Sequence, residues 1–317
     1  MKRTIYSLLV LSIFGIFLMM SLPSCRKNNI ELNIHQYDAQ QIQNYIAANH
    51  LTGFKPDTVN GDTSGIWYRI AVPGSGTPMQ YSDLVTFVYT ERTVDGKWYR
   101  ADTITQHYYD YVGHIQNNGL TQGLQLAVHD LMVYPNATIR VLVPSHLAFG
   151  VNGTAGSGSS QVANSLIAGN QCMDFYVHGV NNFGPYDDLV IRHYMADSAL
   201  TGYSETADSI YYKVLIPGAT DDPITQVSSI VCTYTGQLLD ATVFDGGYNG
   251  TNTATFPMLG FATPGNVEAL EKAAQAGTKL SVILPSKQGY GILGNSAGGI
   301  PPFSCLRFTW QVITVTP

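Results

Sequence analysis

The residues of this chain that could bind a metal ion are scattered. None of its eight histidines has another histidine four positions away, and no two of its four cysteines form a Cys-x-x-Cys pair. Metal sites are commonly built on such short spacings, because neighbouring ligands on one element then point at a common centre. We therefore expect neither a catalytic nor a structural metal site.

A segment rich in glycine and serine, residues 150–169, is the stretch that suggests phosphate chemistry. A phosphate-binding loop also needs a Gly-Lys-Ser or Gly-Lys-Thr sequence, and none follows this segment. We therefore predict a mobile flap here. The net charge of −6, with only 12% charged residues, also leaves no basic stripe for nucleic acid, so we expect neutral or apolar partners.

Parts of the sequence repeat, so the elements that would position functional residues are expected to occur twice. The run from residue 42 to 54 returns at 191 to 203, and the run around Ile66 returns around Ile210. A repeat this long exceeds the roughly 20–50 residues of a solenoid unit, so each copy should fold around its own core. We refer to the two units as the first and the second copy. The predicted organisation is a signal peptide at 1–24, a tether and linker helix at 25–60, a divergent domain at 61–181, a linker helix at 182–203 and a second domain at 204–317.

The N-terminus combines a basic start, an apolar run from Ile5 to Leu22, and Cys25. This order resembles a bacterial lipoprotein signal, in which the cysteine becomes the acylated first residue. The resemblance implies lipid on Cys25 and a protein tethered to a membrane of the cell envelope, facing the periplasm or in the outer membrane. An uncleaved anchor helix is the alternative, because the run approaches the ~18 residues that suggest a span.

Three further cysteines, Cys172, Cys232 and Cys305, lie in a chain whose predicted compartment permits disulfides. Cys172 and Cys305 hold equivalent places in the two copies and so belong to different domains. Strand alternation puts Cys232 and Cys305 on opposite faces of one sheet. The sequence therefore predicts three free thiols.

Each copy has the pattern of several strands and one short helix. In the second copy, residues 230–236 and 306–312 alternate apolar and polar side chains, which predicts half-buried antiparallel strands. Between them, residues 267–274 place their apolar positions on one helical face, with Asn266 expected to cap the helix and Gly277 to end it. The first copy repeats strand, helix and strand at 85–89, 124–131 and 173–177. A helix-like stretch precedes each copy, at 37–51 and 187–200. This pattern predicts an α+β fold.

The second copy carries a series of motifs that resembles one known family. The motifs are the strand, turn and strand from Val231 to Asp245, then Leu284-Pro285, Tyr290-Gly291, Ile300-Pro301-Pro302 and the strand from Leu306 to Phe308. Their order and spacing resemble those of the FKBP-type peptidyl-prolyl cis-trans isomerases. The resemblance implies two tandem FKBP-like domains, each a curved antiparallel sheet wrapped on one short helix.

The resemblance also implies which residues line the substrate pocket. The expected catalytic residues are Tyr234, Phe244, Asp245, Tyr290, Ile300 and Phe308, and the expected substrate-binding residues are Phe256, Val267 and Gly265, with Met258 as an alternative to Phe256. Val267 departs from the tryptophan that the family commonly has as the pocket floor. Pro264 has no N–H to offer a ligand carbonyl, so Gly265 would have to supply one. Both departures predict lower activity.

A pocket of this kind needs no nucleophile, metal or cofactor. Rotation about an X–Pro bond must break amide resonance, a barrier of about 18–20 kcal/mol. An apolar pocket disfavours the planar, dipolar amide relative to the twisted one, so it binds the transition state preferentially. In this interpretation the aromatic residues hold the proline ring, while the Tyr290 hydroxyl and the Ile300 backbone N–H hold substrate carbonyls. Asp245 would either orient Tyr234 or polarise the amide.

The first copy retains only the apolar part of this pattern. Tyr89 and Tyr99 match the first two aromatic positions, but Arg100 stands where the acid is expected. Leu124 takes the place of the floor, and Phe149 replaces the tyrosine of the Tyr-Gly pair. We expect this copy to bind weakly or to serve structure and docking.

Two classes of function remain open. The first is a peptidyl-prolyl isomerase and folding helper that acts through the second copy on proline-containing segments of exported proteins. The second is a non-catalytic peptide-binding or scaffold lipoprotein on a degenerate fold, which Val267 and Arg100 favour. Measuring X–Pro exchange separates them, because a binder changes peptide signals without faster exchange.

Overall fold

The structure is a computed structural model that describes residues 32–59, 64–154, 166–219, 223–246 and 253–317. The signal peptide predicted at 1–24 and the acylation predicted at Cys25 lie outside the described residues, as does the central part of the predicted flap. Within the described residues, no helix is long and apolar enough to cross a membrane.

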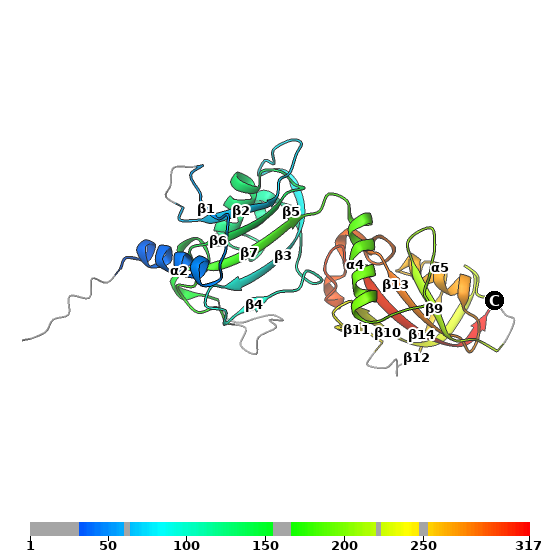
Figure 1. The fold of residues 1–317 in the computed structure, drawn as a ribbon. Coiled ribbons are helices and arrows are strands. Elements are labelled where there is room, and N and C mark those ends of the chain that lie inside the picture. The colour runs from blue at the N-terminus through cyan, green and yellow to red at the C-terminus, as the bar shows by residue number, and fades with distance from the viewer. Residues whose placement is uncertain (1–31, 60–63, 155–165, 220–222, 247–252) are drawn as a thin grey trace, which may run out of the picture. The chain divides into compact units, whose positions relative to one another are not determined.

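The first copy folds into a seven-stranded sheet in which neighbouring strands are antiparallel (Figure 1). Its strands are β1 (Lys55–Pro56), β2 (Trp67–Val72), β3 (Leu84–Thr93), β4 (Tyr99–Arg100), β5 (His107–Tyr111), β6 (Thr138–Val143) and β7 (Met173–Gly179). They lie in the order β1-β2-β6-β7-β3-β4, and β5 pairs with β3. The helix α3 (Gln122–Leu126) continues into a π-helical stretch at Ala127–Met132, and both contact β6.

The second copy has the same architecture. Its strands are β8 (Ser204–Glu205), β9 (Tyr211–Ile216), β10 (Ser229–Leu238), β11 (Val243–Asp245), β12 (Thr253–Pro257), β13 (Lys279–Leu284) and β14 (Leu306–Thr316), with helix α5 at Pro264–Ala273. The strand order β11-β10-β14-β13-β9-β8, with β12 on β10, matches that of the first copy read in reverse. The predicted α+β fold of two similar units is therefore confirmed.

Alternation along the two longest strands of the second copy builds its core. Every second residue of β10 from Ile230 to Leu238 is buried, and so is every second residue of β14 from Leu306 to Val312. The two strands pair side by side, with Tyr234 opposite Trp310 and Gly236 opposite Phe308. Both predicted strands and the faces that they bury are confirmed.

The ends of α5 differ from those expected. Thr263 has extended backbone angles at the N-cap position and Pro264 is the first helical residue, which suits its fixed φ. Asn266 lies inside the first turn, fully buried, where its Nδ2 donates to Thr263 Oγ1 at 2.9 Å. The helix ends at Ala273, and Gly277, with φ of +87°, belongs to the turn that leads into β13. The predicted cap and stop were therefore wrong by a few residues.

Each sheet carries a helix on its outer face, anchored by a buried aspartate. The two helices are α2 (Ile34–Ala48) and α4 (Phe183–Asp197). In α2, Asp38 Oδ2 accepts a hydrogen bond from Ser145 Oγ at 3.0 Å. In α4, Asp187 Oδ2 accepts hydrogen bonds from the N and Oγ of Ser286 at 2.8 and 2.6 Å. Each helix is thus packed on its own copy, and begins slightly before the stretch predicted from the sequence.

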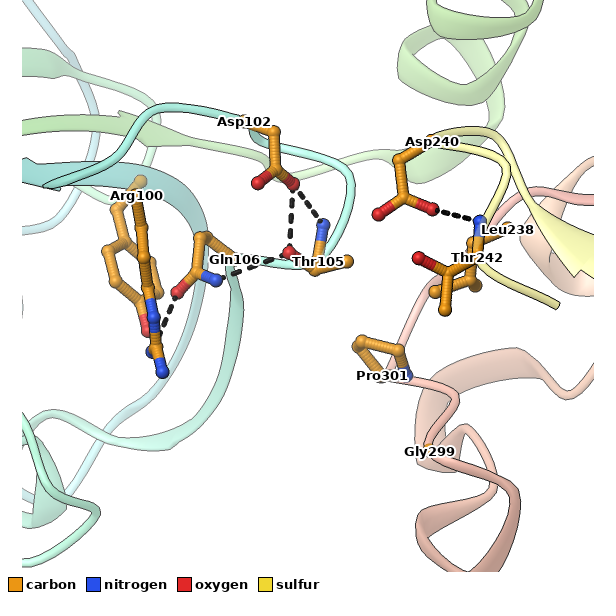
Figure 2. Close-up of a pocket in the computed structure, with 10 residues that line it drawn as sticks. Arg100, Asp102, Thr105, Gln106, Leu238, Asp240, Thr242, Gly299 and Pro301 are labelled. Atoms are coloured by element: carbon orange, nitrogen blue, oxygen red, sulfur yellow. Dashed lines mark hydrogen bonds between the residues drawn. The ribbon is translucent and has the colours of Figure 1, made fainter. Parts of the chain in front are cut away.

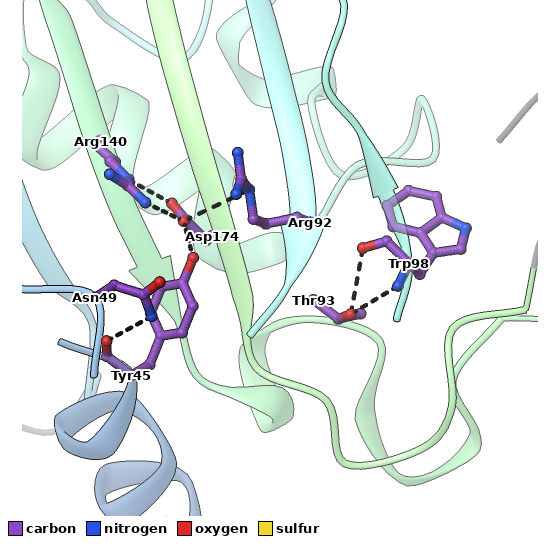
Figure 3. A network of polar contacts seen from close by, with 7 residues as sticks. All are labelled: Tyr45, Asn49, Arg92, Thr93, Trp98, Arg140 and Asp174. Atoms are coloured by element: carbon purple, nitrogen blue, oxygen red, sulfur yellow. Dashed lines mark hydrogen bonds and ion pairs between the residues drawn. The ribbon is translucent and has the colours of Figure 1, made fainter. Parts of the chain in front are cut away.

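A second polar contact fixes α2 to its sheet (Figure 3). The Tyr45 hydroxyl donates to Asp174 Oδ2 at 2.7 Å, and Arg140 donates to the same carboxylate from Nε at 2.9 Å and Nη2 at 2.6 Å. In the second copy the equivalent strand residue is Arg307, whose Nη1 donates to the Tyr194 hydroxyl at 2.9 Å. The helix tyrosine is retained, whereas the charge of the strand residue is reversed.

The three cysteines within the described residues are free and buried, as predicted. Cys232 lies in the core between sheet and α5, whereas Cys305 lies in a separate cluster with Ile191 of α4. Burial raises the pKa of the Cys232 thiol to about 12. A thiol that stays protonated at neutral pH is a poor nucleophile, so this residue acts as a core side chain.

Candidate functional site

One apolar cluster of the second copy brings together most of the predicted site residues. Its buried members include Tyr234, Ile300 and Phe308, and Phe244, Phe256, Val267 and Tyr290 pack against it while partly exposed. The ring centroids of Tyr234 and Phe256 are 5.4 Å apart, and those of Phe244 and Phe308 are 5.7 Å apart. Met258, the alternative wall, is buried in the same cluster.

The absence of a side chain at Gly236 allows two of these rings to meet. A Cβ atom at this position would lie 2.7 Å from the Phe244 ring and 2.9 Å from the Phe308 ring, closer than packed atoms approach. Phe308 faces Gly236 directly across the β10–β14 pair. We call Tyr234, Phe244 and Phe308, together with Gly236, the aromatic cup.

Trp310 supplies a floor that sequence reasoning missed. Its indole is fully buried and stacks between Tyr234 and Phe308, with centroid distances of 4.9 and 5.6 Å. The Nε1–H donates to Asn266 Oδ1 at 2.9 Å, so the buried asparagine fixes the indole. Alternation predicted that Trp310 points inward, and its pairing with Tyr234 is the further signal that could have placed it here. The large ring that Val267 lacks on α5 is thus present on β14.

Asp245 reaches the rim of the aromatic cup from β11. Its carboxylate accepts a hydrogen bond from the Tyr234 hydroxyl. Burial, and then this hydrogen bond, raise the pKa of Tyr234, because a phenolate beside a carboxylate is unfavourable. The Asp245 Oδ1 also accepts from the Gly246 N–H at 2.7 Å. Both roles considered for Asp245, the orientation of Tyr234 and the polarisation of the amide, stay predictions.

Tyr290 and Ile300 belong to the loop that follows β13. Burial raises the pKa of Tyr290, while a hydrogen bond with the Asn295 side chain opposes the shift. The Ile300 N–H donates to the Asn295 backbone oxygen at 2.9 Å, and the Asn295 N–H donates back to Ile300 at 2.8 Å. The N–H of Ile300 is engaged within the loop, so the expectation that it holds a substrate carbonyl was wrong. Its side chain remains part of the apolar cluster.

The start of α5 is packed tightly. A Cβ on Gly265 would lie 2.7 Å from Leu284 Cδ2 and 2.8 Å from Gln288 Cβ. The glycine is therefore required for α5 to approach β13 and the turn after it. Its part in substrate binding stays a prediction.

The first copy holds a glutamate where the second has Gly236. Glu91 pairs with Arg100 and faces Phe175, just as Gly236 pairs with Asp245 and faces Phe308. The Glu91 side chain is 4% exposed, and its Oε1 lies 3.5 Å from Arg100 Nη1. Burial raises the pKa of Glu91 to about 7, although Arg100 opposes this shift. The carboxylate occupies the place that the aromatic cup leaves without a side chain.

Larger side chains also fill the neighbouring positions of the first copy. Phe87 and Tyr108 form a cross-strand pair whose rings stack at 4.7 Å, where the second copy has the smaller pair Cys232 and Ala254. Tyr99, expected to match Phe244, is 38% exposed and does not join the core. Sequence reasoning placed Arg100 correctly but missed Glu91 and Phe87.

Arg100 is also tied to a polar loop of the first copy. Its Nη1 donates to Gln106 Oε1 at 3.5 Å, and Gln106 Nε2 donates to Thr105 Oγ1 at 3.2 Å (Figure 2). The Thr105 hydroxyl in turn donates to Asp102 Oδ1 at 2.8 Å. Arg100, which takes the place of Asp245, is thus held by Glu91 on one side and by Gln106 on the other.

No group of three potential metal ligands gathers anywhere in the part of the chain that the structure describes. The side chains gathered at the candidate site are aromatic rings, two tyrosine hydroxyls and one carboxylate. Such a site can bind and desolvate a neutral, dipolar group.

Comparisons with known proteins agree with this arrangement. Residues 221–313 match the sequence model of the FKBP-type peptidyl-prolyl cis-trans isomerases. The FKBP-type 22 kDa peptidyl-prolyl cis-trans isomerase of Escherichia coli is 30% identical over 125 residues, which are 39% of this chain and 59% of that protein. FkpA of Aeromonas hydrophila is 33% identical over 121 residues, which are 38% of this chain and 43% of that protein. The chain thus spans less than two thirds of the length of these relatives.

Longer and structural matches are weaker. Human FKBP9 is 26% identical over 243 residues, which are 76% of this chain and 36% of that protein. The crystal structure of Escherichia coli FkpA aligns with a TM-score of 0.36 at 27% identity, covering 42% of this chain and 61% of that one. The second copy therefore matches the FKBP-type peptidyl-prolyl cis-trans isomerase family over residues 221–313.

Proposed function

We propose that the second copy catalyses cis-trans isomerisation of X–Pro bonds. The observation that carries the proposal is the aromatic cup, in which Gly236 lets Phe244 and Phe308 meet beside Tyr234. A proline ring bound here would remove its amide from water. Because the planar amide is more dipolar than the twisted one, this transfer lowers the barrier of about 18–20 kcal/mol to rotation.

Individual residues would act by position rather than by covalent chemistry. Tyr234, Phe244 and Phe308 would hold the proline ring, and Trp310 would close the site below them. The Tyr290 hydroxyl would donate to a substrate carbonyl. Asp245 would hold the Tyr234 ring in place through its hydroxyl.

The proposed setting is the cell envelope. The N-terminal pattern ending at Cys25 supports acylation of this cysteine and a tethered protein. The clients of the proposed isomerase would be proline-containing segments of exported proteins. Such proteins fold slowly where X–Pro bonds must isomerise. Mass spectrometry of the membrane fraction would test the anchor, since acylation adds lipid mass to a chain that begins at Cys25.

Two-dimensional NMR exchange spectroscopy on short X–Pro peptides tests the activity with the chain from residue 26 onward. We expect wild type to accelerate exchange, and Phe244→Ala to lose most of this acceleration. The matched control is Tyr99→Ala in the first copy, which should keep it. Equal acceleration in wild type and Phe244→Ala would refute the assignment of the site.

The alternative is a non-catalytic peptide-binding or scaffold lipoprotein. Pro264, which offers no N–H at the start of α5, favours it. In the same experiment a binder would shift peptide resonances without any gain in exchange rate.

A further inference from the structure

A cavity opens at the start of α5, next to the aromatic cup. Its volume of about 440 Å³ is within the roughly 300–1,000 Å³ of typical ligand pockets. Met258, Phe261 and Val267 supply apolar walls. The Phe261 ring lies edge-on to Phe256 at 5.1 Å and to Trp310 at 6.0 Å, so this wall continues into the floor of the cup.

The same cavity carries two carboxylates. Glu268 and Glu271 lie three residues apart on α5 and both line the cavity. The Oε1 of Glu271 is buried and has no hydrogen-bond partner among the described residues. Among the described residues, those that line the cavity include no lysine, arginine or histidine. The ammonium of Lys272, the cation of α5, lies 6.0 Å from the Tyr212 ring centroid and is not part of the lining.

We propose that this cavity binds the side chain of a lysine or arginine residue that flanks the substrate proline. The alkyl part would pack on Met258, Phe261 and Val267, and the cationic head would reach Glu268 and Glu271. A buried carboxylate oxygen without a partner is costly, and a cationic donor satisfies it. The inference rests on the proposed isomerase function, because a proline in the aromatic cup brings its neighbouring residue to this cavity.

The first copy provides an internal contrast. Gly123 packs against Val143 as Gly265 packs against Leu284, so the places of Glu268 and Glu271 fall on Leu126 and His129. Neither residue is acidic. The acidic cavity is therefore a property of the second copy and not of the shared fold.

The test measures kcat/KM by NMR exchange on peptides with one Leu–Pro bond. Lysine, norleucine or glutamate stands either directly before the leucine or directly after the proline. We expect the lysine peptide to exceed the norleucine peptide by about tenfold at one of these positions, and the preference to weaken with salt. The double variant E268Q/E271Q should bring the ratio close to one. The control Glu205→Gln on β8, which pairs with Arg192, should keep it.

A lysine preference that is absent at both positions, or that survives in E268Q/E271Q, overturns the proposal. If no peptide is isomerised faster, the proposed function has failed, and the same comparison is made on peptide Kd by calorimetry. Tighter binding of the lysine peptide to wild type than to E268Q/E271Q would still support the cavity. Equal or undetectable binding of the lysine and norleucine peptides would overturn it.

Discussion

On the long strand of the second copy, Gly236 lets Phe244 and Phe308 meet, whereas the same place in the first copy holds Glu91. The strand order around both positions is the same. At this one position, two aromatic rings meet over a glycine in the second copy, whereas a buried carboxylate stands beside the stacked Phe87 and Tyr108 rings in the first. The comparison teaches that a shared fold does not carry the site with it.

The outer faces of the two copies changed far less than the interiors. Asp38 and Asp187 bind equivalent serines, Ser145 and Ser286, at the same corner of each sheet. Cys172 and Cys305 also lie close to these aspartates, and Cys172 Sγ is 3.5 Å from Asp38 Oδ1. The helix attachment therefore serves stability in both copies, while the interior face is specialised in one.

The largest expected effect comes from moving the glutamate of the first copy into the second. Gly236→Glu places side-chain atoms where the Phe244 and Phe308 rings now lie, so we expect kcat/KM to fall by roughly a thousandfold, about 4 kcal/mol. NMR exchange on a Leu–Pro peptide measures this, with circular dichroism to verify folding. Glu91→Gln is the matched control and should retain activity. A folded Gly236→Glu protein with full activity would contradict the location of the site.

The second prediction concerns the pH dependence of the first copy. The pKa of Glu91 rises from 4.5 to about 7 on folding, so between these values the folded chain holds a proton that the unfolded chain has lost. Stability of the first copy should therefore fall as pH rises from about 4.5 to 7, by about 3 kcal/mol in total, and then level off. Urea unfolding followed by pulsed hydrogen exchange at fixed labelling pH resolves the two copies. Glu91→Gln should remove this slope, and an unchanged slope would show that another group causes it.

Sequence patterns predicted the parts of the fold that depend on periodicity. The inward faces of β10 and β14 and the opposite orientations of Cys232 and Cys305 followed from alternation alone. The helix ends did not, because Pro264 starts α5 earlier than Asn266 suggests. The asparagine is used instead to hold Trp310, a contact between residues far apart in the sequence.

The interior of the site was less accessible to sequence reasoning. Whether a position is open depends on which residue faces it across the sheet, as Phe308 faces Gly236 and Phe175 faces Glu91. Backbone hydrogen bonds within a loop likewise depend on how the loop folds back on itself. For this reason the hydrogen bond from the Ile300 N–H to Asn295 was missed. Family spacing places residues in a region, but register decides what each one contacts.

The third prediction tests the helix attachment that the copies share. Asp187→Ala removes the acceptor of two hydrogen bonds from buried Ser286, so we expect the second copy to lose about 2 kcal/mol of unfolding free energy. Burial raises the pKa of Asp187, while the hydrogen bonds from Ser286 oppose this shift. The same urea and hydrogen exchange experiment measures the loss. Asp197→Asn, exposed at the end of α4, should change stability by less than about 0.5 kcal/mol. Equal losses in the two variants would mean that the buried contact contributes nothing specific.

The smallest expected effect comes from Tyr290, the tyrosine of the Tyr-Gly pair, and from Phe149, which takes its place in the first copy. Tyr290→Phe removes one hydroxyl donor, so we expect about a fivefold loss in kcat/KM, corresponding to about 1 kcal/mol for one hydrogen bond. The reciprocal Phe149→Tyr in the first copy should give no gain in a chain whose second copy is inactivated by Phe244→Ala. Glu91 and Phe87 still occupy the places of Gly236 and Cys232 in the first copy, so we expect a hydroxyl at its edge to add no activity. A gain from Phe149→Tyr alone would mean that the first copy already admits substrate, and that the two copies differ in polar groups rather than in available space.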